Sequence, residues 1–198
     1  MNPTDIDHLI KFGWVEIKNY FPKELVSSLY DYAYSLNEQD RFRQARIKNQ
    51  LFKEKNLNIR RDSIFWVDNW AISPALADYR AEIDRLQSLL KNELRISIKS
   101  FEGHLAYYSQ GDFYKKHIDQ HLTTRHRQIS FVSYLNKSQG GELVIYNRDN
   151  KLLVEKIVYP EPGTLVLFLS PIIFHEVKET ISERFSLTGW FRDDLPLV

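Results

Sequence analysis

The chain has no cysteine among its 198 residues, and it contains only one methionine. Without cysteine there is no disulfide, no thiolate nucleophile and no cysteine-ligated zinc or iron–sulfur site. Any metal site must therefore use histidine, aspartate or glutamate side chains.

The sequence also lacks an excess of charge and a long apolar segment. Its 27 basic and 26 acidic residues nearly cancel, so the net charge does not indicate nucleic acid or an anionic membrane as a partner. The most apolar run, residues 164–174, is short and contains Pro171, and residues 1–12 do not have the pattern of a targeting signal. We expect a soluble, cytoplasmic protein with no membrane or nucleic-acid partner.

Helical patterns come first along the chain. A short helix capped at Thr4 and a strand from Trp14 are expected, and longer helices with apolar stripes are expected after Pro22 and from Ala75. These stripes are core faces. The polar, basic segment of about 40–61 between the longer helices is interpreted as a mobile loop.

From residue 96 onward the pattern changes to strands. Seven short segments rich in β-branched and aromatic residues follow one another, separated by Gly, Asn, Pro and Ser. Close spacing without helical periods favours antiparallel pairing in a sandwich or jelly roll. We therefore predict a mainly β, α+β fold in one domain, 1–198, with helical support over 1–95 and the β core over 96–193.

The segment HIDQH, residues 117–121, offers three metal-capable side chains at alternate positions. On a strand, alternate positions point to one face, so His117, Asp119 and His121 could share one ion. In a jelly roll, strands distant in sequence face each other across the barrel mouth, so His175 could instead meet His117 and form the set His117, Asp119 and His175. Two histidines and one aspartate form the facial triad of non-haem Fe(II), while a tetrahedral zinc hydrolase site is the rival interpretation. His8, His104 and His126 are expected to be structural.

Arg184 is the candidate anchor for an anionic ligand. It lies in an apolar run beside Phe185 and Leu187, where a surface ion pair is less expected. A guanidinium there could bind a carboxylate through two hydrogen bonds, with Ser186 or a tyrosine hydroxyl adding a third.

The combined pattern resembles a known family. The residues are Tyr108-x-x-Gly111-x-x-Tyr114-x-x-His117-x-Asp119, then SYLN (133–136), GGEL (140–143), PGTLVLF (162–168), His175-Glu176-Val177 and Arg184. They resemble the Fe(II)/2-oxoglutarate-dependent dioxygenases, and among these the prolyl hydroxylase domain type with its bacterial relatives. FRQARI (42–47) and IRRDSIFWVD (59–68) resemble further segments of the bacterial relatives, so the likeness extends from Phe42 onward.

This resemblance implies a double-stranded β-helix in which His117, Asp119 and His175 bind Fe(II). It places Arg184 on the far carboxylate of 2-oxoglutarate with Tyr134 beside it. Other residues would line the pocket or meet the substrate. The resemblance implies Tyr108, Leu143, Val177 and Trp190 as pocket residues, with Tyr114 and Arg127 near the substrate. From the residue types themselves, Ser186 is a further pocket candidate and Trp66 a further substrate-binding candidate.

The family also implies the reaction. 2-Oxoglutarate and O₂ would be cosubstrates, ascorbate is a further candidate cofactor, and succinate and CO₂ would be released as a prolyl residue of an intracellular protein is hydroxylated. A protein of the translation apparatus is one candidate substrate. Hydroxylation of another residue type or of a small molecule remains the alternative. A catalytically silent or zinc-holding binding module is the least supported hypothesis.

Overall fold

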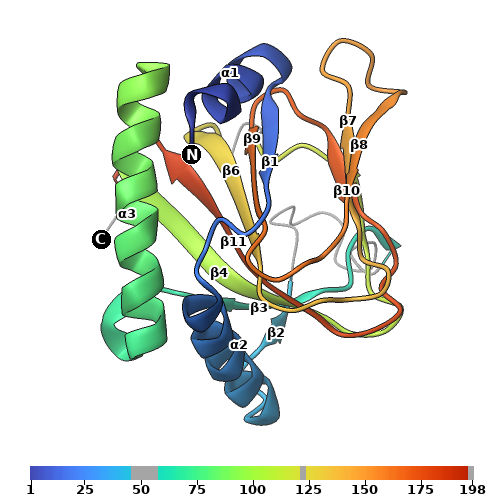
Figure 1. Cartoon of the computed structure of the whole chain (residues 1–198). Helices are drawn as coiled ribbons and strands as arrows, with labels where there is room; N and C mark the ends of the chain where they lie inside the picture. The colour runs from blue at the N-terminus through green and yellow to red at the C-terminus, as the bar shows by residue number, and fades with distance from the viewer. Residues whose placement is uncertain (46–57, 121–123, 196–198) are drawn as a thin grey trace.

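The computed structural model describes residues 1–45, 58–120 and 124–195. Two sheets face each other, and the helices lie on the outer side of the larger sheet (Figure 1). In chain order the elements are α1 (Pro3–Phe12), β1 (Trp14–Ile17), α2 (Lys23–Glu38), β2 (Arg43–Gln44), β3 (Ser63–Trp66), η2 (Trp70–Ile72), α3 (Pro74–Leu94), β4 (Ser100–Tyr108), β5 (Tyr114–His117), β6 (Arg127–Tyr134), β7 (Leu143–Tyr146), β8 (Val154–Val158), β9 (Leu165–Leu169), β10 (His175–Val177) and β11 (Arg184–Arg192).

The ends of α1 follow from its local sequence. The Asn2 side chain accepts a hydrogen bond from the Asp5 backbone N–H at 3.0 Å, and the Asp5 carboxylate accepts one from the Asn2 N–H at 2.8 Å. This reciprocal pair satisfies two N–H groups that the first turn leaves unpaired. Gly13 ends the helix with φ +82°, a left-handed conformation that glycine adopts without a Cβ penalty. The predicted helix is confirmed, but its cap is Asn2 and not Thr4.

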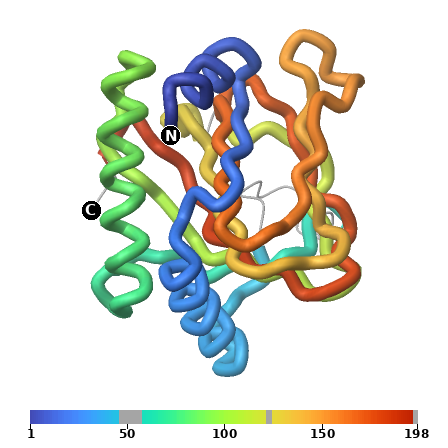
Figure 2. The backbone as a smooth tube through the Cα atoms, in the orientation of Figure 1, coloured from blue at the N-terminus to red at the C-terminus, as the bar shows by residue number. Residues whose placement is uncertain are grey.

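The two sheets are antiparallel throughout. The larger has the order β1-β9-β6-β11-β4-β3-β2, and the smaller has the order β5-β10-β7-β8. Figure 2 shows β1, near the start of the blue end of the chain, beside the orange β9, where Trp14 pairs with Phe168. The mainly β prediction with antiparallel pairing is confirmed.

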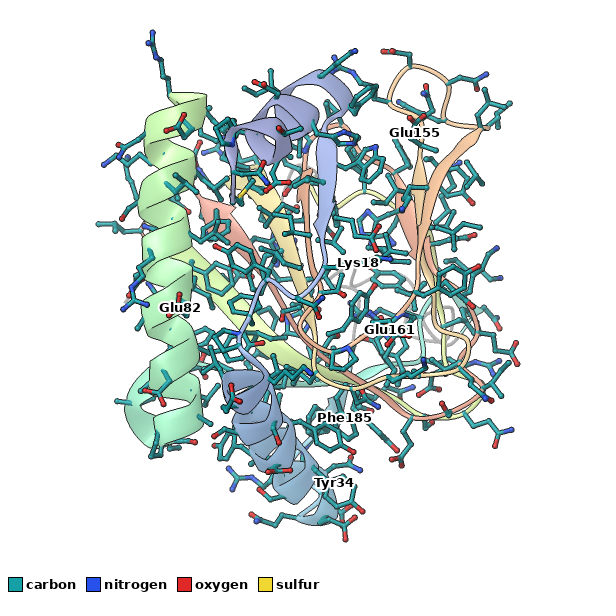
Figure 3. The ribbon with its side chains drawn as sticks, viewed as in Figure 1. Lys18, Tyr34, Glu82, Glu155, Glu161 and Phe185 are labelled. Atoms are coloured by element: carbon teal, nitrogen blue, oxygen red, sulfur yellow. The ribbon has the colours of Figure 1, made fainter. Side chains whose placement is uncertain are left out.

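Strand alternation divides the large sheet into an outer and an inner face. On the outer face, Phe185 of β11 lies 6.4 Å from Tyr34 of α2, measured between ring centroids (Figure 3). Its neighbours on β11 therefore point the other way, toward the small sheet. A second apolar cluster fills this inner space with side chains from both sheets, including Tyr108 and Tyr134 from the large sheet and Leu143 from the small one.

All seven predicted strands form. The sequence pattern missed β5, which ends at His117, so that residues 118–120, including Asp119, lie beyond the strand. Of the predicted mobile loop, residues 46–57 lie outside the described residues. Within the described part of the chain, none of the helices is both long and apolar enough to span a membrane.

Candidate metal centre and active site

Strand pairing brings two predicted metal ligands together from distant parts of the chain. His117 at the end of β5 is the direct cross-strand partner of His175 on β10, and their ring centroids lie 4.1 Å apart. Asp119 follows in a bend just after β5. Its Oδ1 atom lies 3.4 Å from His117 Nε2 and 3.7 Å from His175 Nε2. Three ligand atoms of the type that Fe(II) binds therefore converge at one point.

The backbone fixes which nitrogen each histidine can present. His117 Nδ1 lies 2.8 Å from the Lys115 carbonyl oxygen, and His175 Nδ1 lies 3.3 Å from the Ile173 carbonyl oxygen. A carbonyl only accepts, so Nδ1 donates in both rings and Nε2 keeps its lone pair for a metal. Burial and the neighbouring His117 lower the pKa of His175 to about 4, so its imidazole is neutral at physiological pH.

Two serines orient the third ligand. The Ser130 hydroxyl donates to Asp119 Oδ2 at 2.6 Å and lies 2.8 Å from the Ser170 hydroxyl. Oδ1 is left to face the two histidines. Although burial opposes ionisation, the interactions with His175, His117 and Arg127 hold the pKa of Asp119 well below its usual range. The carboxylate is therefore ready to bind a cation.

The inner site, formed by Arg184, Tyr108 and Tyr134, is a second group of side chains deeper in the same space. Arg184 is only 2% exposed, and its guanidinium carbon lies 4.6 Å from the centre of the Tyr108 ring and 5.0 Å from that of Tyr134. Its Nε and Nη1 atoms are buried without a hydrogen-bond partner among the described residues. A buried guanidinium with unpaired N–H groups fits a bound carboxylate.

Three further predicted pocket residues, Leu143, Val177 and Ser186, are buried. Leu143 and Val177 are cross-strand partners of the small sheet and belong to the same apolar cluster as the two tyrosines. Ser186 is fully buried two residues after Arg184, and its hydroxyl lies 3.5 Å from that of Thr188. Burial raises the pKa of Tyr134 to about 12 while the nearby Arg184 opposes the rise, so the hydroxyl stays protonated.

The rim, formed by Trp66, His104, Arg127 and Trp190, is the third group. The ring centroids of Trp66 and Trp190 are 6.3 Å apart, and the guanidinium carbon of Arg127 lies 3.3 Å from the centre of the Trp190 ring. Arg127 also donates to Glu102 Oε1 at 2.6 Å. Trp66 is 42% exposed. The predicted substrate-binding residues Trp66 and Arg127 therefore lie together, whereas Tyr114 stacks on the metal ligand His117.

Some residues of these groups escaped the sequence analysis. Ser130 could have been found, because it stands four residues before Tyr134 on β6 and so shares its face. His104 has the same relation to Tyr108 on β4. It was expected to be structural, yet it lies 5.0 Å from Trp66 and 5.5 Å from Trp190 between ring centroids. Ser170 carries no periodic signal, because it follows β9 in a turn. His121 lies outside the described residues.

Comparison with known proteins agrees with this geometry. Residues 103–192 match the 2OG-Fe(II) oxygenase superfamily. The structure of a Pseudomonas putida prolyl-4-hydroxylase is 33% identical, with a TM-score of 0.84 over 97% of this chain and 98% of that one. A Trichoplax adhaerens prolyl hydroxylase, solved with a peptide fragment of the hypoxia inducible factor oxygen degradation domain, shares the fold at 24% identity, with a TM-score of 0.82 over 96% of this chain and 87% of that one.

A shorter match is found in the mouse prolyl 3-hydroxylase OGFOD1, which is 40% identical over 76 residues. The match covers 33% of this chain and only 14% of the mouse protein.

The chain belongs to the 2OG-Fe(II) oxygenase superfamily. It is a dioxygenase of the class that uses Fe(II), 2-oxoglutarate and O₂, and the converging ligand atoms and the unpaired Arg184 fit these groups. This membership decides against the zinc hydrolase and the silent binding module that the sequence had left as alternatives.

Proposed function

We propose that this enzyme hydroxylates a prolyl residue of a protein, with release of succinate and CO₂. The observation that carries the proposal is the pairing of two features between the same two sheets. One is the set of converging ligand atoms from His117, Asp119 and His175, and the other is the buried, unpaired guanidinium of Arg184. A metal site alone would suit many reactions, whereas an anion anchor deep in the same space suits 2-oxoglutarate.

Each group of residues has a distinct task in this reaction. Fe(II), when bound with 2-oxoglutarate and O₂, supplies the oxidation of an unactivated C–H bond. His117, Asp119 and His175 would hold the metal through one ligand atom each. Arg184 would bind the far carboxylate of 2-oxoglutarate, and Tyr134 and Ser186 would add hydrogen bonds.

Water exclusion is the second task. Tyr108, Leu143 and Val177 are almost fully buried and would surround the carbon chain of 2-oxoglutarate. A dry pocket strengthens the Arg184–carboxylate interaction and limits side reactions. Trp190, a rim residue that is only 7% exposed, would help to separate the cosubstrate from bulk water.

Recognition of a protein substrate is supported by the rim. Trp66, which is 42% exposed, offers a flat apolar surface of the kind that packs against a pyrrolidine ring, and Arg127 offers donors for a peptide carbonyl. The Pseudomonas relative is a prolyl-4-hydroxylase, and the Trichoplax protein was solved with a peptide. Proline favours the extended and turn conformations that can reach an exposed rim.

Several finer expectations belong to the same proposal. We take the two sheets as a double-stranded β-helix and residues 1–198 as one oxygenase domain. The substrate would be an intracellular protein, with the translation apparatus as one candidate source, and ascorbate would support turnover. These statements rest on the family resemblance.

The test compares proteomes from cells with and without the enzyme, analysed by peptide mass spectrometry for a gain of one oxygen on proline. Purified wild-type enzyme should then add the same oxygen to the unmodified protein and form one succinate per hydroxylation. His175→Ala, which removes a metal ligand, is the inactive control. The similar proteins include a prolyl-4-hydroxylase and a prolyl 3-hydroxylase. Hydroxyproline standards are therefore used to distinguish products hydroxylated at C3 from those hydroxylated at C4. If the oxygen appears on another residue type or only on a free metabolite, the prolyl proposal is wrong.

A further inference from the structure

Tyr114, which the sequence suggested as a wall for the substrate, has both faces of its ring occupied. Its ring is nearly parallel to that of His117, with an interplanar angle of 13° and a centroid distance of 3.6 Å. The guanidinium carbon of Arg60 lies 4.3 Å from the centre of the same ring. A ring face covered at 3.6 Å has no room for a guanidinium, so Arg60 must lie on the opposite face. Only the edge and the hydroxyl of Tyr114 can meet another molecule.

Arg60 is itself held rigidly. Its Nε and Nη2 atoms donate to the two carboxylate oxygens of Asp62 at 2.7 and 2.5 Å. The Asp62 side chain is 1% exposed and that of Arg60 is 14% exposed. Two parallel bonds in a buried setting fix the plane of the guanidinium as well as its position.

The backbone reinforces this arrangement. The Arg61 N–H donates to the Phe113 carbonyl at 3.0 Å, and the Lys115 N–H donates to the Ile59 carbonyl at 2.7 Å. Arg60 and Tyr114 are direct partners in an antiparallel bridge. Residues 59–61 therefore run alongside the start of β5, the strand that ends at the metal ligand His117.

We propose that Arg60 and Tyr114 are positioning residues for His117. The inference rests on the metal site of the proposed function and adds residues that act on it. The bond from Nδ1 to the Lys115 carbonyl leaves the His117 ring free to tilt about that contact, and the stacked Tyr114 ring removes this freedom. Arg60 holds Tyr114 from behind by a cation–π contact, and Asp62 holds Arg60. The chain from Asp62 to His117 thus sets the direction of Nε2.

The proposal is tested by Co(II) binding to the purified full-length protein without 2-oxoglutarate, read from the ligand-field absorption. Tyr114→Leu and Arg60→Met should each weaken Co(II) binding ~10-fold, as expected when support of a metal ligand is lost, and should change the spectrum. Tyr114→Phe keeps the stacked ring and should bind within twofold of wild type. Asp62→Asn, which loosens Arg60 without removing it, should give a smaller loss.

Two controls separate positioning from general damage. Arg85→Met makes the same substitution at a largely exposed helical residue and should leave binding unchanged, while thermal unfolding of each metal-free variant reports folding. Because Arg60 acts through Tyr114, the double variant should bind no more weakly than Tyr114→Leu alone.

Three outcomes contradict the proposal. If Arg60→Met and Tyr114→Leu bind Co(II) with the affinity and spectrum of wild type, neither residue positions His117. If the losses of affinity add in the double variant, Arg60 does not act through Tyr114. The His117→Ala variant tests separately whether His117 is a metal ligand at all. If that variant also binds Co(II) like wild type, the metal site of the proposed function is wrong as well.

Discussion

Two arginines lie against aromatic rings near opposite ends of β11, and they differ in their counter-charge. Arg184 begins the strand between Tyr108 and Tyr134, and no described carboxylate lies within ion-pair distance of it. Arg127, beside the other end of the strand, lies over Trp190 and is paired with Glu102, which also binds Arg192. The same side chain is therefore unpaired in the inner site and neutralised at the rim.

The difference shows what each end of the pocket is built to bind. An unpaired buried charge is costly to the folded protein, and it is kept where a ligand supplies the missing partner. A charge that already has a carboxylate partner can still donate hydrogen bonds to a neutral acceptor. The inner site is therefore suited to a carboxylate, and the rim is suited to an uncharged peptide group.

The largest effect is expected from Arg184→Met. Removing the only guanidinium of the inner site should cost 2-oxoglutarate binding on the order of 2–5 kcal/mol, about 30-fold or more in its Kd. Co(II) binding should be unchanged, and unliganded Arg184→Met should be at least as stable as wild type because an unpaired buried charge is gone. Anaerobic titration with 2-oxoglutarate measures the Kd, and Arg184→Lys should recover only part of it. If 2-oxoglutarate binding is unchanged in Arg184→Met, Arg184 does not bind the carboxylate, and the two arginines do not differ in the way described.

The next effect concerns the loss of stability in acid that His104 at the rim is expected to cause. Burial, with Arg60 and Arg127 nearby, lowers the pKa of His104 at the rim to about 3. The unfolded chain binds a proton near pH 6.5 and the folded protein only near pH 3, so stability is lost as pH falls through this window. Urea unfolding of the metal-free protein should show a loss of about 1.4 kcal/mol per pH unit from this group. His104→Met should remove that share of the slope, and an identical slope in this variant would show that His104 does not carry it.

A smaller effect is expected from Gly141→Ala. Gly141 has φ +67°, and an added Cβ would lie 3.1 Å from Arg184 Cδ and 2.6 Å from Thr180 Cγ2. The variant should weaken 2-oxoglutarate binding about tenfold, the equivalent of about 1.4 kcal/mol, by displacing the guanidinium. Gly111→Ala is the matched control, because its φ is +84° and nothing lies within 4 Å of the added Cβ. Both variants should lose stability, and only Gly141→Ala should lose affinity. Equal affinities would show that Gly141 does not support Arg184.

The smallest effect on the cosubstrate is expected from Arg127→Met. Glu102 keeps Arg192 as a partner, so the folded protein should tolerate the change and 2-oxoglutarate binding should stay within twofold. The KM for the protein substrate should rise about tenfold through loss of a charged donor. Steady-state kinetics with the substrate found by mass spectrometry measures both values. A rise in the 2-oxoglutarate requirement instead would place Arg127 in the inner site.

The sequence predicted the regular parts of the molecule well, because periodicity reports which face of an element is buried. The apolar stripes of α2 and α3 carried that signal. The short β-branched and aromatic segments predicted β6, β9 and β11, and the motif around His117 and Asp119 predicted the site. β5 was missed because its four residues, YKKH, show no apolar alternation. The occupied faces of Tyr114 were also beyond prediction, since they depend on Arg60 and Asp62, which reach Tyr114 only through tertiary pairing.

The cross-strand pairing of His117 with His175 also links metal content to folding. β5 and β10 have only four and three residues, and their ligands meet only after chain segments far apart in sequence have paired. An ion bound between them is released when the strands separate, so it stabilises the paired state by RT ln(1 + [metal]/Kd), about 2.7 kcal/mol at a free metal concentration of 100 Kd. Iron supply would then set how much of the small sheet is paired at equilibrium, as well as how much of the enzyme is active.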